Sequence, residues 1–169
     1  MLQLCMPCYV RSNGKKTKIG LPEVQLGLLP AWGGCSRLPR LVGMAKAIAV
    51  IASGKAFSSR KALGLEMIDA VVRPETLERE ARKWLSKGKK KRLGRLDPYR
   101  RILGWLVAFV AKRKIRAKTR ANYPAPLRAI EVICKGAGEP MALSLDRERR
   151  AFVELADTEA SKNLVRVFF

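Results

Sequence analysis

The sequence contains no histidine, and this absence removes several classes of catalytic site. Serine–histidine and cysteine–histidine nucleophile systems both need an imidazole to take up a proton, so neither can be built from this chain. An imidazole general base is excluded for the same reason. Any acid–base chemistry must therefore come from a carboxylate, a lysine, a tyrosine or a cysteine.

Cysteine is also scarce, with four residues at positions 5, 8, 35 and 134. Cys5 and Cys8 form one C-x-x-C pair, but a structural zinc site needs two further ligands at comparable spacing. Without histidine, only the widely separated Cys35 and Cys134 remain. We therefore expect no metal site, and reduced, mostly buried thiols.

The sequence has no long hydrophobic run. Its longest stretch free of charged residues covers residues 24–36, which is thirteen residues against the roughly 20 that a membrane-spanning helix needs. The apolar opening MLQLCMPCYV lacks the preceding basic region and the following small-residue cleavage site of a signal peptide. These features predict a cytoplasmic chain without a membrane span.

Acidic residues are few, 14 against 35 lysines and arginines, which gives a net charge of +21. Residues 82–120 hold sixteen of the basic residues and a single acid, Asp97. Such a stretch attracts nucleic acid, an acidic membrane face or an acidic partner. No zinc finger, RNP-type aromatic pattern or heptad-linked basic helix accompanies it, which disfavours a dedicated nucleic-acid reader. We interpret the stretch as a solvated basic helical face. The alternative is a non-catalytic basic module that binds a polyanion or a partner subunit.

The pattern of apolar residues predicts an α/β chain that is mostly α-helical with a few short strands. The Asn13-Gly14 pair is a turn signal, and residues 26–34 hold too many glycines and prolines for a regular element. Gly54 is suited to a left-handed helix cap, and Ser58 or Ser59 to an N-cap. Strands are expected at residues 17–20 and 68–72, with a buried strand or helix end at 2–10. Helices are expected at residues 36–53 with a break near Gly43, 59–63, 74–85, 98–118, 127–135 and 141–156, with a last turn capped by Thr158.

One detail of the helical regions adds to this prediction. In the helix at residues 98–118, the apolar residues share one side and lysines and arginines fill the other. Those apolar residues are Ile102, Leu103, Leu106, Phe109 and Val110.

Glu23 is the first candidate for chemistry. It follows a proline in G-L-P-E-V and precedes the glycine-rich segment, whose glycines allow the backbone to approach a ligand closely. This arrangement suits a general acid or base. A Pro-Glu pair can equally well begin a helix, where the acid favours the helix dipole.

Several spaced motifs resemble a known family. The strings GLPEVQLGLLPAWGG, RLPRLVG and SGKAFSSRKALGLEMIDAVV are similar to the signature of the crotonase (enoyl-CoA hydratase/isomerase) superfamily. The later strings NYPAPLRAIEVI and AFVELADTEASKNLV, with the closing FF, resemble the tail and linker helices of the bifunctional β-oxidation α subunit. The resemblance covers most of residues 17–169.

The resemblance implies a division of the chain and a role for it. Residues 1–120 would be a partial crotonase-like domain, and residues 121–169 a helical linker that in the family leads to a 3-hydroxyacyl-CoA dehydrogenase domain. We expect a fragment of a fatty-acid β-oxidation enzyme, whose family-level role is hydration of 2-trans-enoyl-CoA to 3-hydroxyacyl-CoA. Partners would be the acyl-CoA substrate and the remaining domains or a β-oxidation partner subunit.

By the same resemblance, Glu23 matches one of the family's two catalytic glutamates. The substrate-binding positions implied are Gly27, Pro30, Trp32, Gly33 and Gly34. No cofactor is expected in this chain: coenzyme A enters as the substrate thioester, and NAD would belong to the dehydrogenase domain, because the sequence contains no G-x-G-x-x-G fingerprint.

This sequence departs from the family pattern in ways that bear on activity. The upstream G-G-x-E segment that carries the family's first glutamate is absent, and aligning MLQLCM with the family places Met1 at that position. The oxyanion-hole backbone is missing as well. Ala31 replaces a usual glycine, which is harmless if its φ is negative, and Cys35 replaces a usual threonine. We therefore expect the chain to be inactive alone.

Overall fold

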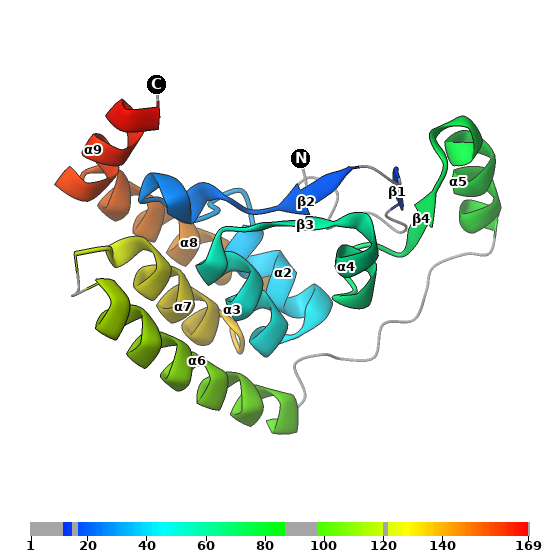
Figure 1. Ribbon diagram of the computed structural model, residues 1–169. Helices are drawn as coiled ribbons and strands as arrows, with labels where there is room; N and C mark the ends of the chain where they lie inside the picture. The colour runs from blue at the N-terminus through cyan, green and yellow to red at the C-terminus, as the bar shows by residue number, and fades with distance from the viewer. Residues whose placement is uncertain (1–11, 15–16, 87–97, 120–121, 169) are drawn as a thin grey trace.

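The computed structural model describes residues 12–14, 17–86, 98–119 and 122–168. Within these residues the chain is mostly helical with a few short strands, which confirms the predicted fold class (Figure 1). None of the described helices is long and apolar enough to cross a membrane. The predicted element at residues 2–10, Cys5 and Cys8 lie outside the described residues.

Two small β pairings lie in the first half of the chain. Strand β2 (Lys18–Gly20) runs antiparallel to β3 (Ala56–Ser58), and β1 (Ser12–Gly14) runs parallel to β4 (Ala70–Val72). The extended segment expected before Gly20 is thus confirmed, while the strand expected over 68–72 is shorter. The turn predicted at Asn13-Gly14 is wrong, because both residues pair with β4; a long-range ladder overrides a local turn preference here.

Helix α3 (Met44–Ser53) is the centre of the helical layer. It packs against α2 (Gly34–Val42), the long helix α6 (Pro98–Thr119) and α7 (Pro124–Gly136). Helix α8 (Met141–Ala156) packs across α2 and α7. Figure 1 shows α6 along the lower edge of this layer, beneath α3 and α7.

The remaining elements lie at the two ends of the molecule. At one end, α9 (Glu159–Phe168) contacts α8 and the short 3-10 helix η1 (Glu23–Leu26). At the other end, α5 (Leu77–Ser86) follows η2 (Pro74–Thr76) and contacts β1 (Figure 1). Helix α4 (Ser59–Gly64) lies between β3 and β4.

One hydrophobic core joins elements that are distant in the sequence. Leu38 of α2, Ile48 of α3 and Ile130 of α7 are fully buried in it. The free thiols of Cys35 and Cys134 are buried as well, as expected. Residues 34–53 and 124–136 therefore fold around the same apolar interior.

The helix ends follow the predicted capping chemistry. Gly54 ends α3 with a left-handed φ of 61°, and the Ser58 hydroxyl accepts from the Lys61 N–H at the start of α4. The Thr158 hydroxyl accepts from the Ser161 N–H at 3.3 Å, at the start of α9. The observed bounds of α8 equal the predicted range of residues 141–156. These ends could be read locally because a cap is made by residues adjacent in the sequence.

Helix α6 has an unexpected orientation. Its predicted apolar residues do share one side, but that side faces solvent, and Ile102, Leu106 and Phe109 are each at least 60% exposed. The buried positions are the small residues Gly104 and Ala108. Helix α6 therefore approaches α3 closely at Gly104, and its partly buried Val107, Ala111 and Ile115 pack against the core.

The position that ends η1, residue 27, requires glycine because of both its backbone conformation and its close neighbours. Its φ is 74°, and a Cβ there would lie 2.8 Å from the Ser161 Cα of α9. We expect Gly27→Ala to lower the free energy of unfolding by at least about 1–2 kcal/mol from the left-handed backbone alone. Urea denaturation followed by circular dichroism measures this change.

Gly64→Ala is the matched control for this prediction. Gly64 lies in helix α4, has no heavy atom within 4 Å of a built Cβ and has no positive φ. Alanine there should be neutral or stabilise by about 0.4–1 kcal/mol. Equal effects of the two substitutions would contradict the assignment of Gly27 as a constrained contact between η1 and α9.

Candidate functional site

Glu23 directly follows Pro22 and is the first residue of η1. Two backbone hydrogen bonds close the end of this short helix. The Gly27 N–H donates to the Val24 carbonyl and the Leu28 N–H donates to the Glu23 carbonyl, both at 3.1 Å. The residue as a whole is half-buried, but its carboxylate oxygen Oε2 is buried. The side chain therefore points at least partly into the protein.

Three side-chain hydrogen bonds to other regions hold η1 in place. The Tyr123 hydroxyl donates to the Val24 carbonyl, and the Ser161 hydroxyl of α9 donates to the Leu26 carbonyl at 3.2 Å. The Gln25 amide donates to the Gly54 carbonyl at 2.8 Å. Burial raises the pKa of Tyr123, which keeps its phenol protonated as a donor. Glu23 is thus carried by a segment that is anchored on three sides.

The predicted substrate-binding residues divide into buried and exposed positions. Pro30, Gly33 and Gly34 are buried, and a Cβ on Gly34 would overlap the Pro30 ring. Trp32 is 74% exposed. Ala31 is not among the described residues with a positive φ, so alanine is tolerated at this glycine position of the family pattern.

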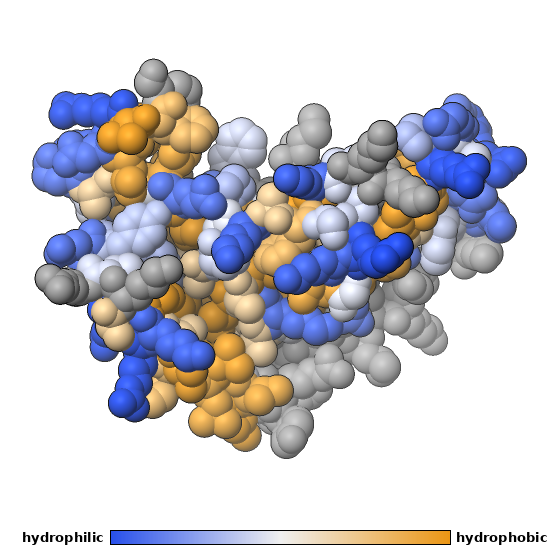
Figure 2. Space-filling model, viewed as in Figure 1, coloured by the Kyte–Doolittle hydropathy of each residue, from blue (hydrophilic) through white to orange (hydrophobic). Residues whose placement is uncertain are grey.

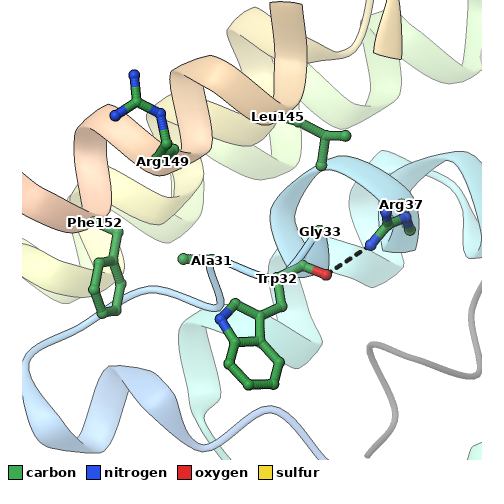
Figure 3. A pocket seen from close by; sticks show the side chains of 7 residues that line it. All are labelled: Ala31, Trp32, Gly33, Arg37, Leu145, Arg149 and Phe152. Atoms are coloured by element: carbon green, nitrogen blue, oxygen red, sulfur yellow. Dashed lines mark hydrogen bonds between the residues drawn. The ribbon is translucent and has the colours of Figure 1, made fainter. Parts of the chain in front are cut away.

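A shallow pocket opens beside this segment, between the start of α2 and helix α8 (Figure 3). Arg37 Nη1 donates to the Trp32 carbonyl at 2.7 Å and so braces one side of the pocket. Glu23, Gly27 and Pro30 are not among its lining residues. The pocket is lined by Ala31, Trp32, Gly33, Arg37, Leu145, Arg149 and Phe152. It therefore brings Trp32 and Gly33 together with α8 but does not include the candidate acid.

The buried carboxylate of Glu148 was not expected from the sequence. Glu148 lies on α8 and is 0% exposed. One of its oxygens accepts from the Gly33 N–H, and the other accepts from the Ser36 N–H at 2.8 Å and from the Ser36 hydroxyl at 2.9 Å. Because the first N–H groups of a helix have no partner inside it, this carboxylate caps α2 from a distant helix.

A polar cluster around Glu148 extends this connection. The Ser144 hydroxyl donates to the Ser36 hydroxyl at 3.0 Å. Arg40 of α2 donates to the Gly136 carbonyl at 3.1 Å and to the Glu139 carbonyl at 2.7 Å, which satisfies the end of α7. Helices α2, α7 and α8 are therefore joined by hydrogen bonds as well as by the core.

Cys35, the second residue of α2, is a buried thiol in this region. Burial raises the pKa of its thiol well above the ordinary value, and the negative charges of Glu148 and Glu23 raise it further. A thiol must ionise to act as a nucleophile, so Cys35 is not a reactive group.

Glu148 supports the glycine-rich segment through its hydrogen bonds to Gly33 and Ser36. Burial raises its pKa, and the hydrogen bonds from Gly33 and Ser36 oppose that shift. Both of its oxygens are already occupied by donors, and the residue is not exposed to solvent. Among the described residues, no group of three or more cysteines and acids is placed to hold a metal ion.

A pattern in the sequence could have revealed Glu148. The buried residues of α8 are Ser144, Glu148, Ala151 and Leu155, which recur at helical spacing on one face. An acid in the middle of an inward face must find hydrogen-bond donors. The pattern predicts such donors, but it does not say which ones.

Removing this carboxylate should destabilise the protein. We expect Glu148→Ala to lower the free energy of unfolding by about 2–4 kcal/mol, since it leaves the buried Gly33 and Ser36 donors unpaired. Glu148→Gln, which keeps one acceptor oxygen, should cost less than the alanine substitution. Thermal and urea denaturation of both variants measure the difference.

The control for this prediction is Glu154→Gln on the same helix. Glu154 pairs with Arg128 at 2.6 Å, but its side chain is 58% exposed, and exposed ion pairs contribute at most about 1 kcal/mol. If Glu148→Ala were no more damaging than Glu154→Gln, the buried cap would not support the fold as described.

Comparison with solved structures places this arrangement in a known fold. The chain is similar to carnitinyl-CoA hydratase from Mycobacterium avium (22% identity, TM-score 0.60) and to an enoyl-CoA hydratase/isomerase from Pseudoalteromonas atlantica T6c (19%, 0.61). It is also similar to enoyl-CoA hydratase from Bacillus halodurans (20%, 0.61). These similarities cover 98–99% of this chain but 54–56% of those chains, so this protein spans about half their length.

At these identities the structural similarity establishes the fold, and the sequence establishes the family. The model of the enoyl-CoA hydratase/isomerase family matches residues 2–96, which is more than half of the chain and includes Glu23 and the whole glycine-rich segment. The chain therefore belongs to the enoyl-CoA hydratase/isomerase family.

Proposed function

We propose that this chain carries one carboxylate of a hydratase site for enoyl-CoA thioesters, and that this carboxylate is Glu23. The observation that carries the proposal is the placement of Glu23: its Oε2 is buried, and η1 is anchored by Tyr123, Ser161 and Gln25. A general acid or base must be held in one geometry to act efficiently. The glycine-rich segment that follows, with Gly27, Pro30, Trp32, Gly33 and Gly34, would contact the thioester.

The reaction sets the role of Glu23. Hydration forms a C–O bond between water and C3 of the 2,3-double bond and a C–H bond at C2. Glu23 would exchange the proton at C2, while a second carboxylate activates the water and backbone N–H groups stabilise the thioester enolate. This sequence has no G-G-x-E segment to supply the second carboxylate, and Glu148 is fully occupied as a helix cap.

The wider context is also a proposal. The motifs in residues 121–169 support a β-oxidation α subunit, in which a dehydrogenase domain that uses NAD would follow. The boundary between residues 120 and 121 stays a prediction, as do a cytoplasmic location and the absence of a cofactor from this chain. The alternative of a basic polyanion-binding module in place of the hydratase is not favoured, because the family match includes the Glu23 region.

Two measurements on the 169-residue chain test the role of Glu23. Hydration of crotonyl-CoA should be slow or undetectable, because loss of even one oxyanion donor costs about 100- to 1,000-fold in turnover. Exchange of the C2 protons of butyryl-CoA with deuterated water also passes through the thioester enolate, but it needs one base and no activated water. It should therefore be less impaired than hydration and proceed above background. Mass spectrometry of the recovered thioester measures this exchange.

The matched variants are Glu23→Gln and Glu75→Gln. Pro74-Glu75 is also a Pro-Glu pair that begins a 3-10 helix, but Glu75 is exposed. Exchange should fall about 100-fold or more in Glu23→Gln and stay unchanged in Glu75→Gln. Equal rates of exchange in the unaltered chain and in both variants would contradict the assignment of Glu23. Rapid hydration by the unaltered chain would show that another residue of this chain supplies the second carboxylate.

A further inference from the structure

The outward side of α6 carries an apolar patch that the hydratase function does not use. Six large apolar side chains within three helical turns are between 49% and 69% exposed: Ile102, Leu103, Trp105, Leu106, Phe109 and Val110. Scattered exposed leucines are ordinary, but a contiguous patch of this kind marks an interaction surface. Figure 2 shows it as a continuous apolar area over the lower edge of the molecule.

The packing of α6 fixes this patch in its outward position. A Cβ on Gly104 would lie 2.7 Å from the Met44 Cβ of α3, and Ala108 is only 2% exposed. A larger side chain does not fit at this contact. Rotating the helix to bury Leu106 or Phe109 against α3 would therefore force the two helices apart, so the patch is a stable feature of the fold.

Positive charge continues from the apolar patch along the same helix. Arg113, Lys114 and Arg116 are exposed, and α6 contains no acidic residue between its first and last positions. Figure 2 shows hydrophilic surface beside the apolar area on the same edge. We call these three cations and the six apolar residues the α6 face.

The chemistry of the α6 face selects among possible partners. A second copy of this chain would bring together two molecules of charge +21, which repel. Nucleic acid would pair with the cations but leave the apolar side chains in water. An anionic bilayer meets both requirements, because apolar and aromatic side chains enter the boundary between headgroups and acyl chains while the cations contact the headgroups.

We propose that the α6 face binds the surface of an anionic lipid membrane. Helix α6 lies in the interface with Trp105, Leu106 and Phe109 inserted, and Arg113 and Arg116 lie against lipid phosphates. This contact holds the protein on the membrane surface, which none of the described helices is able to cross. The inference does not depend on the role proposed for Glu23, since no residue of the α6 face belongs to that site.

Sedimentation with lipid vesicles tests the proposal. The chain should bind vesicles made of equal parts phosphatidylglycerol and phosphatidylcholine, and bind vesicles of phosphatidylcholine alone much more weakly. Leu106→Gln/Phe109→Gln should weaken binding about tenfold or more, since each side chain loses its burial in the interface. Arg113→Gln/Arg116→Gln should weaken it about fivefold for each cation removed, and added salt should reduce the effect.

Matched control variants distinguish binding through the α6 face from non-specific binding to vesicles. Arg79→Gln/Lys83→Gln removes the same charge from exposed positions of α5, and Leu143→Gln removes a 58% exposed leucine from α8. Both should bind like the unaltered chain. Circular dichroism should show unchanged helicity and melting temperature in every variant, because all of the substituted side chains are exposed.

Several results would overturn the proposal. Equal affinity for both kinds of vesicle, or no binding to either, rules out an anionic membrane. Equal losses in the α5 and α6 charge variants rule out this face as the contact. Dimers that light scattering detects and that Leu106→Gln/Phe109→Gln abolishes would assign the face to a second copy. Salt-sensitive DNA binding that this variant does not change, in a protein that does not bind vesicles, would assign the face to nucleic acid.

Discussion

The arrangement of the glycine-rich segment depends on one buried carboxylate. Glu148 reaches from α8 to the first turn of α2 and accepts hydrogen bonds from Gly33 and Ser36. A charge in this position is stable only when donors surround it, and the unpaired N–H groups of a helix start provide them. The contact joins groups more than a hundred residues apart, so the shape of the segment near Glu23 requires that α8 be folded onto α2.

The same dependence on the later helices holds for η1. Tyr123 precedes α7 and Ser161 lies on α9, and both donate to carbonyl groups of the short helix that Glu23 begins. Gly27 has no side chain because α9 approaches it closely. The residues that resemble a linker in sequence are therefore the physical support of the candidate site, and a carboxylate on a 3-10 turn of four residues obtains its rigidity from them.

The proposed hydratase site and the proposed membrane-binding face differ in where their large and small side chains lie. Around Glu23, burial and small residues hold groups close together, as the proposed acid–base chemistry on a thioester requires. On α6, the small residues face inward to α3, and the large apolar side chains and cations remain outside. The protein can therefore present a membrane-binding face without exposing the core that supports the site.

The sequence by itself determined the helical character of the chain, the caps at Gly54, Ser58 and Thr158, the bounds of α8 and the family, because each depends on neighbouring residues or on motifs in a fixed order. It also singled out Glu23, whose catalytic role stays a prediction. The tertiary structure decided that Asn13 and Gly14 pair with β4, that Glu148 caps α2, and that the apolar side of α6 faces outward. These features arise from contacts between distant segments, where a ladder, a buried charge or the close approach of two helices outweighs local preference.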